Sequence, residues 1–132
     1  MRNIKALNIL VVEDDIAFAT LAQQLLSDHT CQIASNGKEA LKAFSSFQPD
    51  ITFLDISLPD KSGYDILYEI LKINPQAFVV MLTGSNVSDD VKLSIAMGAT
   101  SYIVKPLSRK TIKKSIDKYL SKTQQHQKLS SA

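Results

Sequence analysis

The chain has 132 residues, of which 45% are hydrophobic and 21% charged, and its formal net charge is +2. This length predicts one domain with an ordinary core, and so small a charge does not indicate a dedicated nucleic-acid or membrane-surface binder. A single cysteine, Cys31, excludes an internal disulfide and favours a reducing, cytoplasmic setting, where we expect it to be a small buried hydrophobe. No segment approaches the ~18 apolar residues of a membrane span, and acids interrupt the N-terminus before a signal-peptide core is complete.

Short apolar runs alternate with segments of helical spacing along the chain. The runs, rich in Val, Ile, Phe and Thr, predict strands at residues 8–12, 30–34, 51–54, 78–82 and 101–104. Apolar residues recurring three and four positions apart predict helices around residues 18–25, 40–44, 66–71, 91–96 and 112–120. The runs ILVV and FVVML are continuously apolar, which is typical of parallel strands covered on both faces. The pattern predicts an α/β doubly wound domain over residues 1–121.

The C-terminal part of the sequence differs in composition. Residues 122–132 are polar and lack apolar periodicity, so we expect a frayed tail or the start of a linker. The last predicted helix is basic on the side opposite its apolar stripe, with Arg109, Lys110, Lys113, Lys114 and Lys118. A solvated face is the first interpretation, docking of an acidic protein surface the second, and nucleic-acid binding the third, because aromatic stacking residues are missing from this face.

Polar side chains follow four of the five predicted strands. They are Glu13, Asp14 and Asp15 after the first, Asp55 after the third, Thr83 after the fourth and Lys105 after the fifth. Right-handed crossovers make all the strands parallel, so these groups should meet at one edge of the sheet, where α/β folds bind ligands. Asp15 is best placed to cap the first helix, and Asp60 is expected to be a solvated loop acid.

This combination of groups favours phosphoryl chemistry. Clustered carboxylates repel one another, so they either hold protons or recruit a cation, and an all-oxygen cluster favours Mg²⁺. Such an ion is commonly shared with a phosphate, whose other oxygens Lys105 and Thr83 could contact. Asp55 would then be the nucleophile that forms an acyl phosphate.

Four segments, ILVVEDD, LDISLPDKSG, VVMLTGS and SYIVKP, occur in this order, each at a predicted strand end. Together they resemble the receiver domain of bacterial two-component response regulators, over about residues 5–121. The resemblance implies a flavodoxin-like (βα)5 fold, a five-stranded parallel sheet in the order 2-1-3-4-5. It also implies that Asp55 takes phosphate from a sensor histidine kinase or a histidine phosphotransfer protein.

The resemblance also assigns roles to other residues. It implies that Asp14, Asp55 and the backbone carbonyl of Ser57 bind Mg²⁺, with Glu13 helping through water. Lys105 matches the phosphate-binding lysine and precedes an implied cis peptide bond to Pro106.

Two further residues match the family's conformational switch. Thr83 matches the switch hydroxyl, and Tyr102 matches the aromatic residue that turns inward when the threonine moves toward the phosphoryl group. The switch would alter the face formed by the fourth helix, fifth strand and fifth helix. The partner of this face could be a downstream protein, an effector domain, or a second copy of the chain in a phosphorylation-dependent homodimer. We expect no membrane partner and no direct binding of nucleic acid.

Two alternatives to this switch remain open on the sequence. A Mg²⁺-dependent aspartyl phosphatase would need a second acid two residues after the nucleophile, where this chain has Ser57, and a substrate cap for which little chain is left. A phosphorylation-independent interaction module of the same fold would not need the acids, Thr83 or Lys105. We expect a signalling switch that assists its own phosphorylation and dephosphorylation, and the small residues Ser57 and Ser85 predict an intermediate phosphoryl lifetime.

Overall fold

The computed structural model describes residues 6–84 and 88–131, with residues 88 and 124–131 described by their backbone alone. Strands and helices alternate five times. The strands are β1 (Asn8–Val12), β2 (Thr30–Ala34), β3 (Ile51–Asp55), β4 (Val79–Thr83) and β5 (Ser101–Val104). The helices are α1 (Ile16–Leu25), α2 (Gly37–Phe47), α3 (Gly63–Ile73), α4 (Ser88–Ala96) and α5 (Arg109–Ser131).

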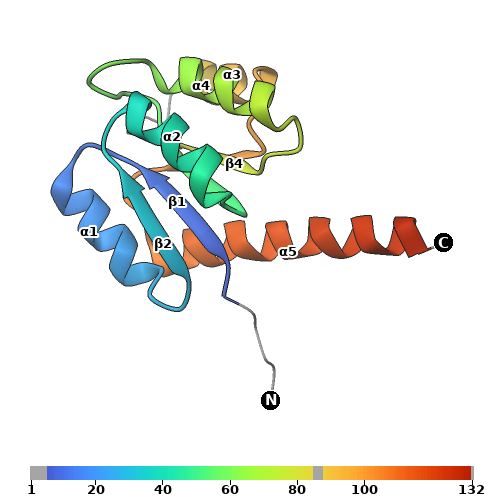
Figure 1. The fold of residues 1–132 in the computed structure, drawn as a ribbon. Helices are drawn as coiled ribbons and strands as arrows, with labels where there is room; N and C mark the ends of the chain where they lie inside the picture. Colours follow the sequence, from blue (N-terminus) through green and yellow to red (C-terminus); the bar gives the residue numbers. More distant parts are fainter. Residues whose placement is uncertain (1–5, 85–87, 132) are drawn as a thin grey trace.

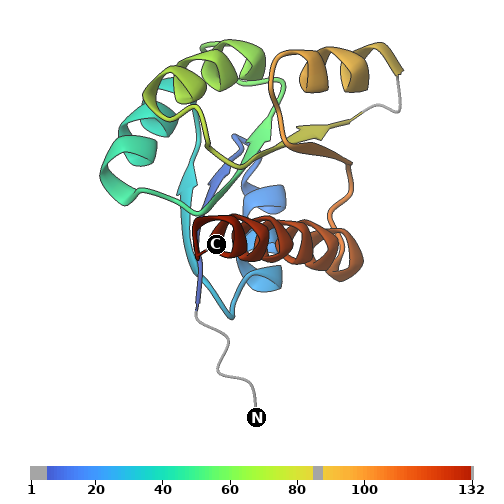
Figure 2. The same ribbon diagram turned by 90° about the vertical axis from the view of Figure 1, so that its right-hand side faces the viewer.

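The strands form one parallel sheet in the order β2-β1-β3-β4-β5, which confirms the predicted fold. Helices α1 and α5 cover one face, and α2, α3 and α4 lie on the other side (Figures 1 and 2). Two buried clusters of aliphatic and aromatic side chains fill these layers, one on each face of the sheet. Every residue of β3 and β4 is buried, as expected for central strands covered on both faces.

Three strand boundaries differ from the prediction by one residue, since β4 begins at Val79 rather than at residue 78, and β3 and β4 each end one residue later. Asp55 and Thr83 are the last residues of β3 and β4, where loop positions were expected, because each still pairs with the neighbouring strand. Both predicted site residues are therefore carried by the sheet itself. This placement is more rigid than a loop position would be.

Cys31 lies in β2, the edge strand, and is only partly buried. The expectation of a buried cysteine holds in part, since the side chain packs against the cluster on the α1 and α5 face. An edge strand has one neighbour instead of two, which leaves its side chains more open to water.

Helix α5 continues to Ser131, through the segment expected to fray. Lys and Gln are good helix formers, and no Gly or Pro occurs after Pro106 to stop the helix. The loss of apolar periodicity marks where α5 leaves the core, and Figure 1 shows its C-terminal turns projecting beyond the sheet. None of the helices in the described part of the chain is long and apolar enough to cross a membrane.

Candidate functional site

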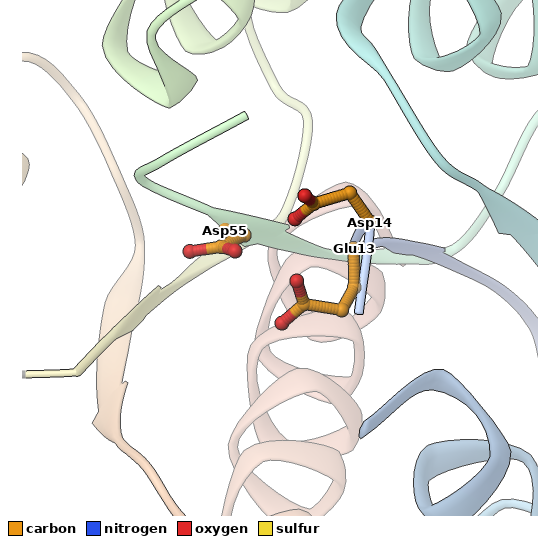
Figure 3. A group of neighbouring side chains, drawn as sticks. All are labelled: Glu13, Asp14 and Asp55. Carbon is orange, nitrogen blue, oxygen red and sulfur yellow. The ribbon is translucent and has the colours of Figure 1, made fainter. Parts of the chain in front are cut away.

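Three carboxylates meet at the C-terminal edge of the sheet. Glu13 and Asp14 follow β1, Asp55 ends β3, and these two strands pair directly. One oxygen from each residue lies within 4.8 Å of the others, and Figure 3 shows the three side chains gathered at this edge. Glu13 and Asp55 are buried, whereas Asp14 is exposed to solvent. The convergence predicted for these acids is confirmed, and the cluster is open on the side of Asp14.

Lys105 joins this cluster from the loop after β5. Its Nζ donates to Glu13 Oε1 at 2.6 Å and to Asp55 Oδ2 at 3.3 Å. The backbone N–H of Lys105 donates to the carbonyl of Thr83 at 2.8 Å, so the lysine and the threonine are held side by side. The peptide bond from Lys105 to Pro106 is cis, as the resemblance implied.

The charges of this cluster depend on one another. Burial raises the pKa of Glu13, and the neighbouring Asp55 raises it further, although Lys105 acts in the opposite direction. Burial opposes the positive charge of Lys105, but the hydrogen bond to Glu13 and the charge of Asp55 outweigh it and raise the pKa of the ammonium. Lys105 is therefore a firmly held cation beside two buried carboxyl groups.

The donor set fits a small hard cation. All three residues offer carboxylate oxygens, and Mg²⁺ is bound by one or two carboxylates while it keeps several waters. Lys105 forms ion pairs with Glu13 and Asp55. Among the described residues, no lysine, arginine or histidine forms an ion pair with Asp14. A divalent ion would relieve the repulsion that one ammonium leaves uncompensated.

The loop after β3 is held tightly behind Asp55. Its first residues are fixed by the N–H of Ser57, which donates to Asp55 Oδ1 at 3.2 Å, and by the N–H of Gly63, which donates to the carbonyl of Ile56. A Cβ at Gly63 would lie 2.2 Å from the carbonyl oxygen of Asp55, so only glycine fits this position. This close approach of Gly63 to Asp55 is a feature of the folded loop that the sequence pattern did not predict.

Asp60, in the same loop, is exposed as the sequence suggested, but it also makes hydrogen bonds that the sequence did not predict. Its two carboxylate oxygens accept from the backbone N–H groups of Gly37 and Lys38, at 2.7 and 3.1 Å. These bonds lower the pKa of Asp60 and satisfy donors at the start of α2, which have no partner within the helix. Asp60 therefore ties the loop that follows Asp55 and contains Ser57 to the start of α2.

The remaining predicted residues lie where their strands place them. Thr83 is buried at the end of β4, next to β3, and Tyr102 is 41% exposed on β5, opposite Met81. Asp15 caps α1 as expected, because its Oδ1 accepts from the backbone N–H groups of Ala17 and Phe18. Ser85, the second small position of the prediction, lies outside the described residues.

The order of the strands and the residues at their ends define a flavodoxin-like signalling domain. Residues 9–117 match the family described as the response regulator receiver domain. The chain belongs to this family. Chemotaxis protein CheY of Listeria monocytogenes is 30% identical over 115 residues, which cover 85% of this chain and 97% of CheY.

Solved structures agree with the sequence comparison. A CheY-like response regulator receiver domain protein from Methanospirillum hungatei has a TM-score of 0.84 and 26% identity, over 92% of this chain and 99% of that chain. NtrX from Brucella abortus has a TM-score of 0.87 and 30% identity, over 96% of this chain but only 29% of NtrX. The same domain therefore occurs both nearly alone and as part of longer regulators.

Proposed function

We propose that this receiver domain is a phosphorylation switch whose acceptor is Asp55. The observation that carries the proposal is the meeting of the three carboxylates within 4.8 Å, with Lys105 Nζ at 3.3 Å from Asp55. An oxygen of Asp55 would form a bond to the phosphorus of a phosphohistidine donor, while the P–N bond breaks and its electron pair returns to the imidazole nitrogen. The donor would be a sensor histidine kinase or a histidine phosphotransfer protein.

The residues around Asp55 have distinct roles in this proposal. Asp14, Asp55 and the backbone carbonyl of Ser57 would hold Mg²⁺, with Glu13 acting through water. The bound ion would neutralise charge on the phosphoryl oxygens. Lys105 would exchange its bond to Asp55 for one to a phosphoryl oxygen. The buried position of Asp55 and the small side chain of Ser57 support an acyl phosphate of intermediate lifetime.

Thr83 and Tyr102 would pass the change on to the surface. Thr83 would move toward the phosphoryl group and leave space at the end of β4 that the exposed ring of Tyr102 fills. The face of α4, β5 and α5 would then bind its partner differently. For a nearly complete change, a phosphoryl dianion held by Mg²⁺ and Lys105 would have to favour the switched state by about 5.5 kcal/mol.

The output of the switch lies outside this domain. We assign the receiver function to residues 1–121 and treat residues 122–132 as a polar tail or the start of a linker. The partner would be a downstream protein, an effector domain or a second copy of the chain in a cytoplasmic signalling pathway. The basic residues of α5, such as the exposed Lys113 and Lys118, would favour an acidic surface on it.

A small phosphodonor tests the proposal directly. With acetyl phosphate and Mg²⁺, the wild-type protein should gain one phosphoryl group per chain, and both EDTA and Asp55→Asn should abolish the labelling. Asp50→Asn, at the other end of β3, is the matched control and should keep it. Release of phosphate over many turnovers would favour an aspartyl phosphatase instead, and a protein that takes no label would favour an interaction module independent of phosphorylation.

A further inference from the structure

The ammonium of Lys105 has a third neighbour besides Glu13 and Asp55. The ring of Phe18, on the first turn of α1, lies with its centroid 4.5 Å from Lys105 Nζ. From the sequence alone, Phe18 is simply one of the apolar residues with helical spacing. The structure brings it to the functional site from 87 positions away in the chain.

Phe18 is held from two directions. Its backbone N–H donates to Oδ1 of Asp15, the cap of α1, at 3.2 Å. Its side chain is partly buried and packs against the hydrophobic cluster between the sheet and helices α1 and α5. A ring fixed in this way offers a defined face to the lysine, and the lysine does not have to order it.

The contact suits a lysine that must change partners. An ammonium has three N–H donors and no acceptor, and here Glu13 and Asp55 accept two of them. An aromatic face attracts a cation without using a lone pair, and more strongly where water is partly excluded, as at this lysine with its side chain only 25% exposed. The ring can therefore hold the ammonium while its hydrogen-bond acceptors are exchanged.

We propose that Phe18 is a positioning residue for phosphoryl transfer, which keeps the Lys105 ammonium at the rim while its bond to Asp55 is replaced by one to a phosphoryl oxygen. This inference rests on the proposed function. Without the ring, Lys105 would sample positions away from Asp55, and fewer encounters with a phosphodonor would find the cation in place. The loss should affect the rate of phosphorylation rather than folding.

Four variants separate the aromatic face from simple packing. Phe18→Leu and Phe18→Met keep an apolar side chain of similar size but remove the ring, whereas Phe18→Tyr restores it. Tyr68→Leu is a matched control, because it removes another cation–π contact, with Lys72 at 5.4 Å, on the opposite face of the sheet. Urea denaturation of each variant would establish that it is folded.

The initial rate of labelling by acetyl phosphate in saturating Mg²⁺ is the measurement. We expect Phe18→Leu and Phe18→Met to lower this rate by about two- to fivefold, while Phe18→Tyr and Tyr68→Leu retain the wild-type rate. Wild-type rates in the Leu and Met variants would overturn the proposal. An equal loss in all three Phe18 variants would overturn it too, because packing alone would then explain the effect.

The outcome for the wild-type protein keeps the two proposals distinguishable. A wild-type protein that takes no label would overturn the proposed function, and the role of Phe18 with it. A wild-type protein that is labelled normally, beside Leu and Met variants of equal rate, would overturn the role of Phe18 alone.

Discussion

The two ends of β3 carry the same residue type in opposite circumstances. Asp50 precedes the strand, and its oxygens accept from the backbone N–H of Asn8 at 2.8 Å and from the hydroxyl of Tyr119 at 3.3 Å. Asp55 ends the strand within 4.8 Å of two other carboxylates, with the cation of Lys105 at 3.3 Å. A carboxylate surrounded by neutral donors fastens the structure, whereas one placed among like charges costs stability and is available for chemistry.

The residues around Asp50 have a structural role. Tyr119 packs edge-on against Phe78, with ring centroids 5.4 Å apart, and Lys122 lies over Phe78 at 5.7 Å. These contacts fix α5 to the N-terminal edge of the sheet. One end of the sheet thus anchors the last helix, and the other end carries the acid cluster that we propose binds a cation and accepts a phosphoryl group.

Removing one negative charge at each end of β3 should change the free energy of unfolding in opposite directions. Asp50→Asn should lower the free energy of unfolding by about 1–2 kcal/mol, because an amide has only one acceptor oxygen for the two donors. Asp55→Asn should raise it by about 1 kcal/mol, because it relieves repulsion with Glu13 and Asp14. Urea denaturation at neutral pH without Mg²⁺ measures both. Destabilisation of similar size in both variants would show that the two aspartates do not differ in the way described.

The hydroxyl of Tyr119 should make the protein sensitive to alkali. Burial raises its pKa, and the negative charge of Asp50 raises it further. The unfolded chain therefore ionises first, so this contribution is complete below about pH 10 and is lost as the pH rises toward the folded-state pKa. Tyr119→Phe should be about 1 kcal/mol less stable at neutral pH, and its stability should fall less between pH 9 and 11 than that of the wild type. If the stability of the two proteins fell equally between pH 9 and 11, ionisation of Tyr119 would not be linked to folding.

Of these substitutions, the one at Asp60 should change the free energy of unfolding least, and its effect should disappear at acidic pH. The N–H of Gly37, and then that of Lys38, lower the pKa of this exposed carboxyl group. Its contribution is present above the unfolded-state pKa of about 3.9 and is lost as the pH falls through the lower folded-state value. In denaturation series between pH 3 and 6, Asp60→Asn should be slightly less stable than the wild type at pH 6, and the two should converge near pH 3. A difference in stability between the two proteins that stays constant from pH 3 to 6 would show that protonation of Asp60 is not linked to folding.

The sequence predicted the parts of the molecule that topology determines. Parallel strands must end at a common edge, so the meeting of Glu13, Asp55 and Lys105 followed from the residues at their ends. The contacts of Asp60 with the start of α2, of Asp50 with Tyr119 and of Phe18 with Lys105 could not be predicted. Each depends on how side chains from distant segments lie after packing, which neither periodicity nor spacing encodes.

The proposed acceptance of a phosphoryl group by Asp55 can be tested at the level of the single residue. Protein labelled with acetyl phosphate and Mg²⁺ can be reduced with borohydride, which converts an acyl phosphate of aspartate into homoserine, and then mapped by peptide mass spectrometry. We predict homoserine at position 55 and at no other aspartate, and no reduced glutamate. Unmodified Asp55 in protein that has nevertheless taken up phosphate, or homoserine at Asp14 or Asp50, would contradict the account.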